Sequence, residues 1–98
     1  MKPKPLKSAQ IRAARALLRW SAADLARDAA LGLATIKRAE LADGETSMTA
    51  ANDLAVRRAL EDAGVEFIDE NGGGTGVRLR QRRRSKALAV TTVAKRQQ

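Results

Sequence analysis

The side chains of this sequence that could do chemistry are almost all charged. The 98 residues include 19 Lys and Arg and 11 Asp and Glu, with no His and no Cys. Without those two residue types the chain lacks the common acid–base catalyst at neutral pH and the thiolate that attacks substrates or binds soft metals. The acid pairs Asp24/Asp28 and Glu61/Asp62 are then best interpreted as solvated or ion-paired helix surfaces. We therefore expect no enzyme activity, no metal site and no cofactor.

The excess of positive charge predicts a polyanionic partner, and its distribution along the chain is uneven. The net charge is +8 and the isoelectric point is near 11.1. Residues 1–38 hold nine basic and two acidic side chains, whereas residues 39–76 hold two basic and nine acidic ones. Residues 77–98 hold eight basic side chains and no acid. The first 76 residues are therefore neutral overall, and the last 22 carry the whole surplus.

The densest basic segment follows a run of glycines. Its arginines are Arg78, Arg80, Arg82, Arg83 and Arg84. Such a segment predicts sequence-independent contact with nucleic-acid phosphates. It is also compatible with a solvated, solubilising tail, and with a specific role in minor-groove insertion or RNA binding. The glycine run at residues 72–76 is not followed by Gly-Lys-Ser/Thr, so it predicts a hairpin turn and not a phosphate-binding loop.

Apolar spacing predicts four helices behind a short N-terminal arm. Alternating prolines make residues 1–7 a flexible basic arm. The helices are expected at residues 8–20, 22–30, 33–42 and 50–63. Ser8, Ser21 and Thr49 are the expected N-caps, and Gly64 suits the left-handed position after the last helix. The inward-facing residues expected on the third helix are Ile36, Ala39 and Leu41.

Strand-like alternation replaces helical spacing in residues 65–80. Two strands are predicted at residues 65–68 and 76–80, joined by a glycine-rich loop. Their shared apolar face would be made of Val65, Phe67, Val77 and Leu79. Because a two-stranded sheet cannot leave so much apolar surface in water, we expect this face to pack on the helices or to pair with its twin in a homodimer. The predicted division is a flexible basic arm (1–7), a helical domain (8–64), a hairpin (65–80) and a disordered basic tail (81–98).

The second and third predicted helices, joined by a turn of about three residues, form a helix-turn-helix candidate. The small side chain of Ala26 would allow them to cross closely. In this stretch the sequence resembles the lambda repressor/Cro-like (XRE) family of DNA-binding regulators. The matching residues are Leu25-Ala26, Thr35-Ile36 and Glu40, at the family's spacing, with weaker support over residues 8–64. A strand at residues 65–68 followed by a glycine loop is similar to a small bacterial subgroup of these regulators.

The resemblance implies a mainly α fold, a lambda-repressor-like helix-turn-helix bundle of four helices followed by a C-terminal β-hairpin. It also implies that the third helix enters the major groove of double-stranded DNA. The residues expected to contact bases are Gly32, Leu33, Ala34, Lys37 and Arg38. Those expected to contact phosphates are Ser21, Ala22, Thr35 and Arg15. Arg15 would also form an orienting ion pair with Glu40.

Side-chain chemistry sharpens these implied roles. Arg38 can donate two hydrogen bonds to O6 and N7 of guanine, whereas Leu33 and Ala34 can offer only apolar contact, as to a thymine methyl. The chain departs from the family pattern at Ala30, where a turn glycine is usual. If φ is positive there, the cost is about 1 kcal/mol, and Gly32 is the alternative place for the bend.

The function expected from the resemblance is sequence-specific transcriptional regulation, and repression in particular. A homodimer would bind a palindromic or pseudopalindromic operator in the bacterial cytoplasm, on the nucleoid. No small-molecule ligand is evident, and no stretch of about 18 apolar residues predicts a membrane span. Two alternatives stay open. One is a protein-interaction module, antitoxin-like or anti-activator, that uses the hairpin and tail, and the other is an RNA binder that uses the arginine tail.

Overall fold

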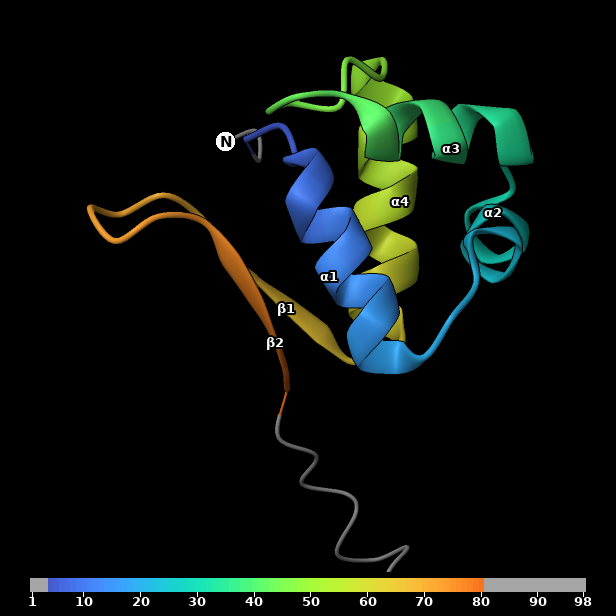
Figure 1. Ribbon diagram of the computed structural model, residues 1–98. Helices are drawn as coiled ribbons and strands as arrows, with labels where there is room; N and C mark the ends of the chain where they lie inside the picture. Colours follow the sequence, from blue (N-terminus) through green and yellow to red (C-terminus); the bar gives the residue numbers. More distant parts are fainter. Residues whose placement is uncertain (1–3, 81–98) are drawn as a thin grey trace, which may run out of the picture.

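The computed structural model describes residues 4–80. It contains four helices followed by a two-stranded antiparallel hairpin (Figure 1). The elements are α1 (Ser8–Leu18), α2 (Ala22–Ala29), α3 (Leu33–Leu41), α4 (Ala50–Asp62), β1 (Val65–Ile68) and β2 (Gly76–Leu79). The predicted order of elements and the mainly helical class are thereby confirmed. Within residues 4–80, no helix is both long enough and apolar enough to cross a membrane.

The helix starts follow the predicted capping chemistry at two of three positions. Ser21 Oγ accepts a backbone N–H of the first turn of α2 at 3.0 Å, and Thr49 Oγ1 does the same for α4 at 3.1 Å. The prediction for Ser8 is wrong, because Lys7 is the N-cap of α1 and Ser8 is its first helical residue. The Lys7 N–H is held by Gln10 Oε1 at 3.0 Å, and this bond takes the place of a serine cap.

Residues 4–7 differ from the flexible arm that the prolines predict. Leu6 has no exposed surface and belongs to the core. Its backbone N–H donates to Asp53 Oδ2 at 3.0 Å, and its carbonyl accepts the Thr46 N–H at 3.2 Å. The prolines exclude a helix here, but they leave an extended segment free to pair with a neighbouring one. Residues 1–3 of the predicted arm and the predicted tail at residues 81–98 lie outside the described residues.

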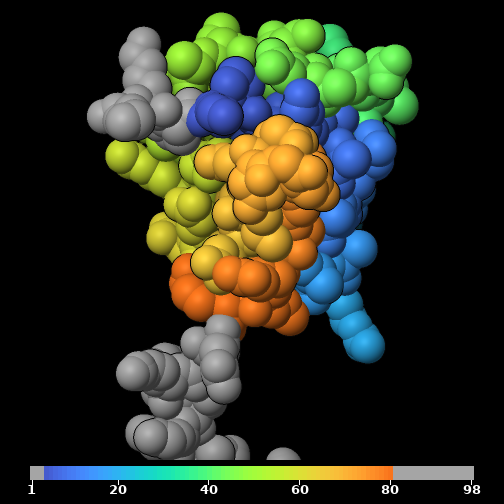
Figure 2. Space-filling view, turned by 90° about the vertical axis from the view of Figure 1, so that its left-hand side faces the viewer, coloured from blue at the N-terminus to red at the C-terminus, as the bar shows by residue number. Residues whose placement is uncertain are grey.

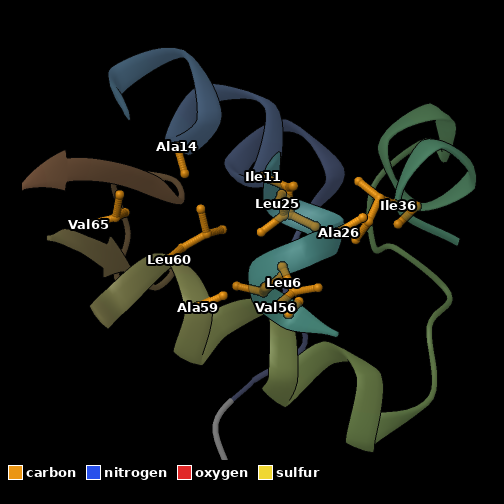
Figure 3. Close-up of a cluster of buried hydrophobic side chains, with 12 residues drawn as sticks. Leu6, Ile11, Ala14, Leu25, Ala26, Ile36, Val56, Ala59, Leu60 and Val65 are labelled. Carbon is orange, nitrogen blue, oxygen red and sulfur yellow. The ribbon is translucent and has the colours of Figure 1, made fainter. Parts of the chain in front are cut away.

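Aliphatic side chains from the arm, the four helices and β1 form the core (Figure 3). The largest fully buried apolar ones are Leu6, Ile11, Leu25, Ile36, Val56, Leu60 and Val65. Ile36 and Ala39 face inward from α3 as predicted. The prediction for Leu41 is wrong, since its side chain is 85% exposed. Leu41 follows Lys37 by about one helical turn and therefore shares its outward face.

The hairpin has the predicted apolar face and packs it on the chain's own helices. The register places Val65 opposite Leu79, and Phe67 opposite Val77. Val65 is fully buried, and Phe67 and Val77 are partly buried against the core, while Leu79 stays 51% exposed. Figure 2 shows the hairpin lying over α1 and α4, which agrees with its contacts to both. Of the two predicted arrangements, packing on the helices is the one observed.

Two polar side chains with little exposure fix the hairpin against the helices. Gln10 Nε2 donates to the carbonyls of Ile68 and Gly76, at 3.3 and 3.1 Å. Those two residues form the last pair of the register before the strands separate into the loop. The Arg57 guanidinium carbon lies 5.0 Å from the centroid of the Phe67 ring, in cation–π contact with β1. α1 thus holds the hairpin at the end next to its loop, and α4 holds it along β1.

Candidate nucleic-acid interface

The turn between α2 and α3 is built around Ala30. This residue adopts φ 58° and ψ 43°, the left-handed conformation, whereas Gly32 is extended with φ −71° and ψ 148°. The Leu31 N–H donates to the Ala26 carbonyl at 2.9 Å and closes the end of α2. The prediction that Gly32 could take over the bend is therefore wrong. The turn carries the strain of a left-handed residue other than glycine, about 1 kcal/mol.

α3 presents one side to the core and the other to solvent. Ile36, Ala39 and Glu40 are buried, and Thr35 is half-buried. All five residues predicted to contact bases are exposed, and Leu41 joins them on the outward side. We call this set the α3 surface: Gly32, Leu33, Ala34, Lys37, Arg38 and Leu41. The structure therefore brings the predicted base-contacting residues together, and it adds one residue that the sequence assigned to the core.

Lys37 and Arg38 have no internal partner in the part of the chain that the structure describes. No ion pair or side-chain hydrogen bond among residues 4–80 involves either of them. Arg15, Arg57 and Arg78, by contrast, are each paired with a carboxylate. A cation without an internal partner can bind an external anion or base without first breaking an existing contact. The positive charges of Lys37 and Arg38 on the α3 surface are therefore available to an external partner.

A polar stripe on α1 holds the C-terminal end of α3. Ser8 Oγ donates to the Ala39 carbonyl at 2.5 Å, and Arg12 Nη1 donates to the Glu40 carbonyl. Arg15 bonds the Glu40 carboxylate. The three α1 residues are spaced by four and three positions, so they lie on one face of that helix. They satisfy two carbonyls at the end of α3 that would otherwise lack partners, and they fix its orientation.

The Arg15–Glu40 pair is a bidentate link between α1 and α3. Arg15 Nε and Nη2 donate to Glu40 Oε2 and Oε1 at 2.6 and 2.8 Å, and Nη1 donates to the Trp20 carbonyl at 2.8 Å. Hydrogen bonding with the Glu40 carboxylate raises the pKa of the Arg15 guanidinium. The predicted orienting pair is therefore present. Because three of its five N–H groups are used inside the protein, Arg15 acts on α3 more directly than on a phosphate.

The start of α2 is occupied by a carboxylate of the same helix. The Ser21 N–H donates to Asp24 Oδ2 at 2.9 Å, and Arg27 Nη2 lies 3.0 Å from Oδ1. The hydrogen bond from the Ser21 backbone, and then the one from Arg27, lower the pKa of Asp24. An ionised carboxylate complements the positive end of the helix dipole, but it repels a phosphate. The phosphate contacts predicted at Ser21 and Ala22 therefore compete with an internal anion.

A pocket that the sequence did not predict lies beside Arg38, with hydroxyl, amide and guanidinium groups in its lining. Its volume is about 230 Å³, and it is lined by Thr35, Arg38, Ala39, Thr46, Ser47, Met48, Thr49 and Asn52. Hydroxyl and amide groups from the α3–α4 loop and the start of α4 supply most of the polar lining, and Arg38 supplies a positive charge. The sequence signal is the cluster of Thr46, Ser47 and Thr49 after Gly44, which local patterns assign only to a turn.

Two basic residues at the end of the hairpin, one in β2 and one just after it, are bonded inside the molecule. Arg78 forms a bidentate pair with Glu66, with Nε 3.0 Å from Oε1, and this hydrogen bonding lowers the pKa of Glu66. Arg80 Nη2 donates to the Glu61 carbonyl at 3.0 Å. Figure 1 shows the hairpin and α2 on opposite sides of α1, and the main contacts of the hairpin are with α1 and α4 and not with α3. The other predicted tail contacts lie outside the described residues: Arg82, Arg83 and Arg84.

The candidate site therefore consists of the α3 surface and the pocket beside Arg38. The polar stripe of α1 supports it from behind, and the tight turn at Ala30 sets its angle to α2. No protein-family model matches the chain, and no curated protein matches it in sequence.

Proposed function

We propose that the protein is a sequence-specific DNA-binding transcriptional regulator of the lambda repressor/Cro-like (XRE) type, in which α2, the turn and α3 form the helix-turn-helix. The observation that carries the proposal is the α3 surface. It combines two exposed cations without partners among residues 4–80 and exposed aliphatic side chains on a helix anchored by α1. A firmly held helix with such a face suits the major groove, which is about 12 Å wide.

The side chains of the α3 surface limit what it can read. Arg38 can donate two hydrogen bonds to O6 and N7 of guanine, and Lys37 can reach a base or a phosphate. Leu33 and Ala34 can contact thymine methyl groups. The surface carries no amide and no carboxylate side chain, the groups that read adenine and cytosine in the major groove. We therefore expect each half-site to contain a guanine close to one or more thymines.

Contacts to phosphates would supply much of the affinity. The pocket beside Arg38 offers hydroxyl groups that can donate hydrogen bonds to phosphate oxygens. Thr35 lines this pocket, which supports the phosphate contact proposed for it. Arg15 serves instead as a positioning residue, because it acts on α3 through Glu40. The arginines at positions 82–84 would add contacts that do not depend on sequence.

Specific regulation requires two copies of the α3 surface. α3 has nine residues and is about 13.5 Å long, so one copy reads only a few base pairs and cannot select a site in a genome. We infer a homodimer whose two α3 helices enter successive major grooves about 34 Å apart on a palindromic operator. A dimer bound over a promoter would exclude polymerase, so repression by occupancy is the proposed mode.

The two alternatives make different demands on the molecule. An interaction module based on the hairpin would need its apolar face, but Phe67 and Val77 pack against the chain's own core. RNA binding through the arginine tail would leave the exposed cations of α3 without a role. The α3 surface therefore favours the regulator over both alternatives.

Selection from random-sequence duplex DNA by the purified protein tests the proposal. We expect an enriched palindrome with a guanine in each half and half-site centres about 10 base pairs apart. Its affinity should fall steeply with added salt, because binding releases counterions from the phosphates. Failure to enrich any sequence would contradict the proposal. Salt-insensitive binding to a protein without binding to DNA would favour the interaction module, and loss of all nucleic-acid binding on removal of residues 81–98 would favour the RNA binder.

A further inference from the structure

The tip of the hairpin carries a separate kind of chemistry, away from the α3 surface. Asn71 precedes Gly72 in the loop between β1 and β2, where residues 69–75 are all exposed. Figure 2 shows the hairpin and this loop on the surface of the molecule. We propose that Asn71 is a site of spontaneous deamidation, and that the hydrogen bonds of the loop promote the reaction. This inference is independent of the proposed DNA binding.

The loop holds both reacting groups in hydrogen bonds. Glu70 Oε2 accepts the Gly72 N–H at 3.1 Å, and it also accepts the Gly74 N–H at 3.1 Å. Asn71 Oδ1 accepts the Gly73 N–H at 3.3 Å. The first bond places a carboxylate on the proton of the nitrogen that must attack, which is the position of a general base. The bond from the Gly73 N–H polarises the Asn71 side-chain carbonyl under attack, as a donor in an oxyanion hole does.

Gly72 has a backbone conformation that favours glycine. Its φ is +99°, and apart from its two chain neighbours no residue has an atom within 4 Å of the place where a Cβ would stand. A residue with a side chain would be strained in this conformation. The glycine therefore supplies a peptide nitrogen with no side chain beside it to hinder the approach to Cγ.

The atoms of the reaction balance without an oxidant or a reductant. Glu70 takes the proton of the Gly72 nitrogen as that nitrogen bonds to Cγ of Asn71. The bond from Cγ to the side-chain nitrogen breaks, and ammonia leaves with the proton returned from Glu70. A solvent water then opens the succinimide at either carbonyl and leaves aspartate or isoaspartate at position 71. Each event adds one negative charge to a loop that already carries Asp69 and Glu70.

The chain contains a matched control in its other asparagine, Asn52. Asn52 is partly buried in α4, and the next peptide nitrogen, that of Asp53, donates to the Thr49 carbonyl at 2.9 Å. Helical hydrogen bonding holds that nitrogen in place, and a side chain follows where Asn71 has a glycine. We therefore expect Asn52 to persist under conditions that convert Asn71.

The experiment is to incubate the full chain at neutral pH and physiological temperature and to follow both asparagines in one sample. Trypsin, used at mildly acidic pH, separates them into fragments 39–57 and 59–78. Liquid chromatography with mass spectrometry then resolves the asparagine, aspartate and isoaspartate forms. We expect Asn71 to convert to both products at least about tenfold faster than Asn52, since a positioned base contributes that much or more.

Two variants test the proton transfer. Glu70→Gln keeps a hydrogen-bond acceptor but cannot take the proton, so conversion of Asn71 should slow by about tenfold. Glu66→Gln makes the same change in β1, where the carboxylate bonds Arg78, and it should leave the rate unchanged. Equal rates at the two asparagines, faster conversion of Asn71 in urea than in the folded protein, or a wild-type rate in Glu70→Gln would each overturn the proposal.

Discussion

Two bidentate arginine–carboxylate pairs in residues 4–80 share their chemistry and differ in their surroundings. Arg15 meets Glu40 between α1 and α3, where the two side chains are 23% and 10% exposed. Arg78 meets Glu66 on the hairpin, where they are 63% and 45% exposed. Water and salt screen an exposed pair, whereas the loss of one partner of a largely buried pair leaves a charge uncompensated. The first pair therefore positions α3, and the second is a surface contact.

The same two regions also differ in the availability of their cations. Arg78 and Arg80 of the hairpin are bonded to Glu66 and to the Glu61 carbonyl. Lys37 and Arg38 of α3 have no partner among the described residues, and α1 holds the helix behind them. Where a chain has many basic residues, those without internal partners on a rigid element are better candidates for recognition than those in the densest cluster.

The largest expected effect comes from removing the charge of Glu40. Glu40→Gln keeps the size of the side chain but leaves the Arg15 guanidinium, with little access to water, without its counterion. We expect the free energy of unfolding to fall by about 2–3 kcal/mol, less than for a fully buried pair because Arg15 keeps some exposure. Urea denaturation followed by circular dichroism measures this loss.

The matched change in the hairpin tests whether burial distinguishes the two pairs. Glu66→Gln removes the same charge from a pair of the same geometry, and the unfolding midpoint should not move measurably. Equal losses of stability in Glu40→Gln and Glu66→Gln would show that burial does not distinguish the two pairs. The positioning role of Arg15 would then have no support.

The next effect concerns specificity at the α3 surface. Arg38→Ala should weaken binding to the selected operator by about 1–3 kcal/mol and abolish the preference for guanine at one position of each half-site. Fluorescence anisotropy on the operator and on a duplex with that base pair changed measures both quantities. Arg58→Ala removes an exposed arginine of α4 and should leave the base preference intact. If Arg38→Ala binds every duplex as the wild type does, Arg38 does not read a base.

Local patterns in the sequence predicted the parts of the fold that depend on neighbours along the chain. Ser21 and Thr49 cap their helices as expected, because a cap needs only the next three residues. Ser8 and Leu6 were assigned incorrectly because their surroundings are set at long range, whereas Leu41 was assigned to the core although helical spacing places it on the outward face with Lys37. The Ser8 hydroxyl bonds a carbonyl 31 residues away, and Leu6 N–H bonds a carboxylate 47 residues away.

In the candidate site, too, the sequence predicted the features that depend on local spacing and missed those that depend on long-range packing. The outward position of Lys37 and Arg38 follows from helical spacing, and the Arg15–Glu40 pair was inferred from a family resemblance. The bond from Arg12 to the end of α3 and the pocket beside Arg38 were not predicted. Both depend on how α1 and the α3–α4 loop approach α3, and a single sequence does not encode that approach in any local pattern.

The turn between α2 and α3 provides a prediction with the opposite sign. Ala30→Gly removes the strain of a left-handed alanine and should raise the free energy of unfolding by about 1 kcal/mol. Ala63→Gly makes the same substitution at the end of α4, where φ is −83° and no strain is relieved. It should give no gain and a small loss from added freedom of the unfolded chain. Equal effects of the two variants in urea denaturation would contradict the strain assigned to the turn.

The smallest expected effect concerns two exposed carboxylates whose pKa values are both lowered, Asp24 at the start of α2 and Glu66 in the hairpin. The Ser21 backbone and then Arg27 lower the pKa of Asp24, and Arg78 lowers that of Glu66. For Asp24, the stabilisation is complete above the ordinary pKa of 3.8 and is lost as the pH falls through the lower pKa of the folded protein, because the unfolded chain binds the proton first. Asp24→Asn should therefore be less stable than the wild type near neutral pH, and the difference should shrink in acid. Urea midpoints measured across the acid range test this.

Asp24 also benefits from the positive end of the α2 dipole, which Glu66 lacks, so its pH-dependent contribution to stability should exceed that of Glu66. If Asp24→Asn and Glu66→Gln lose the same pH-dependent stability, the ion pairs alone account for both effects and the helix terminus contributes nothing.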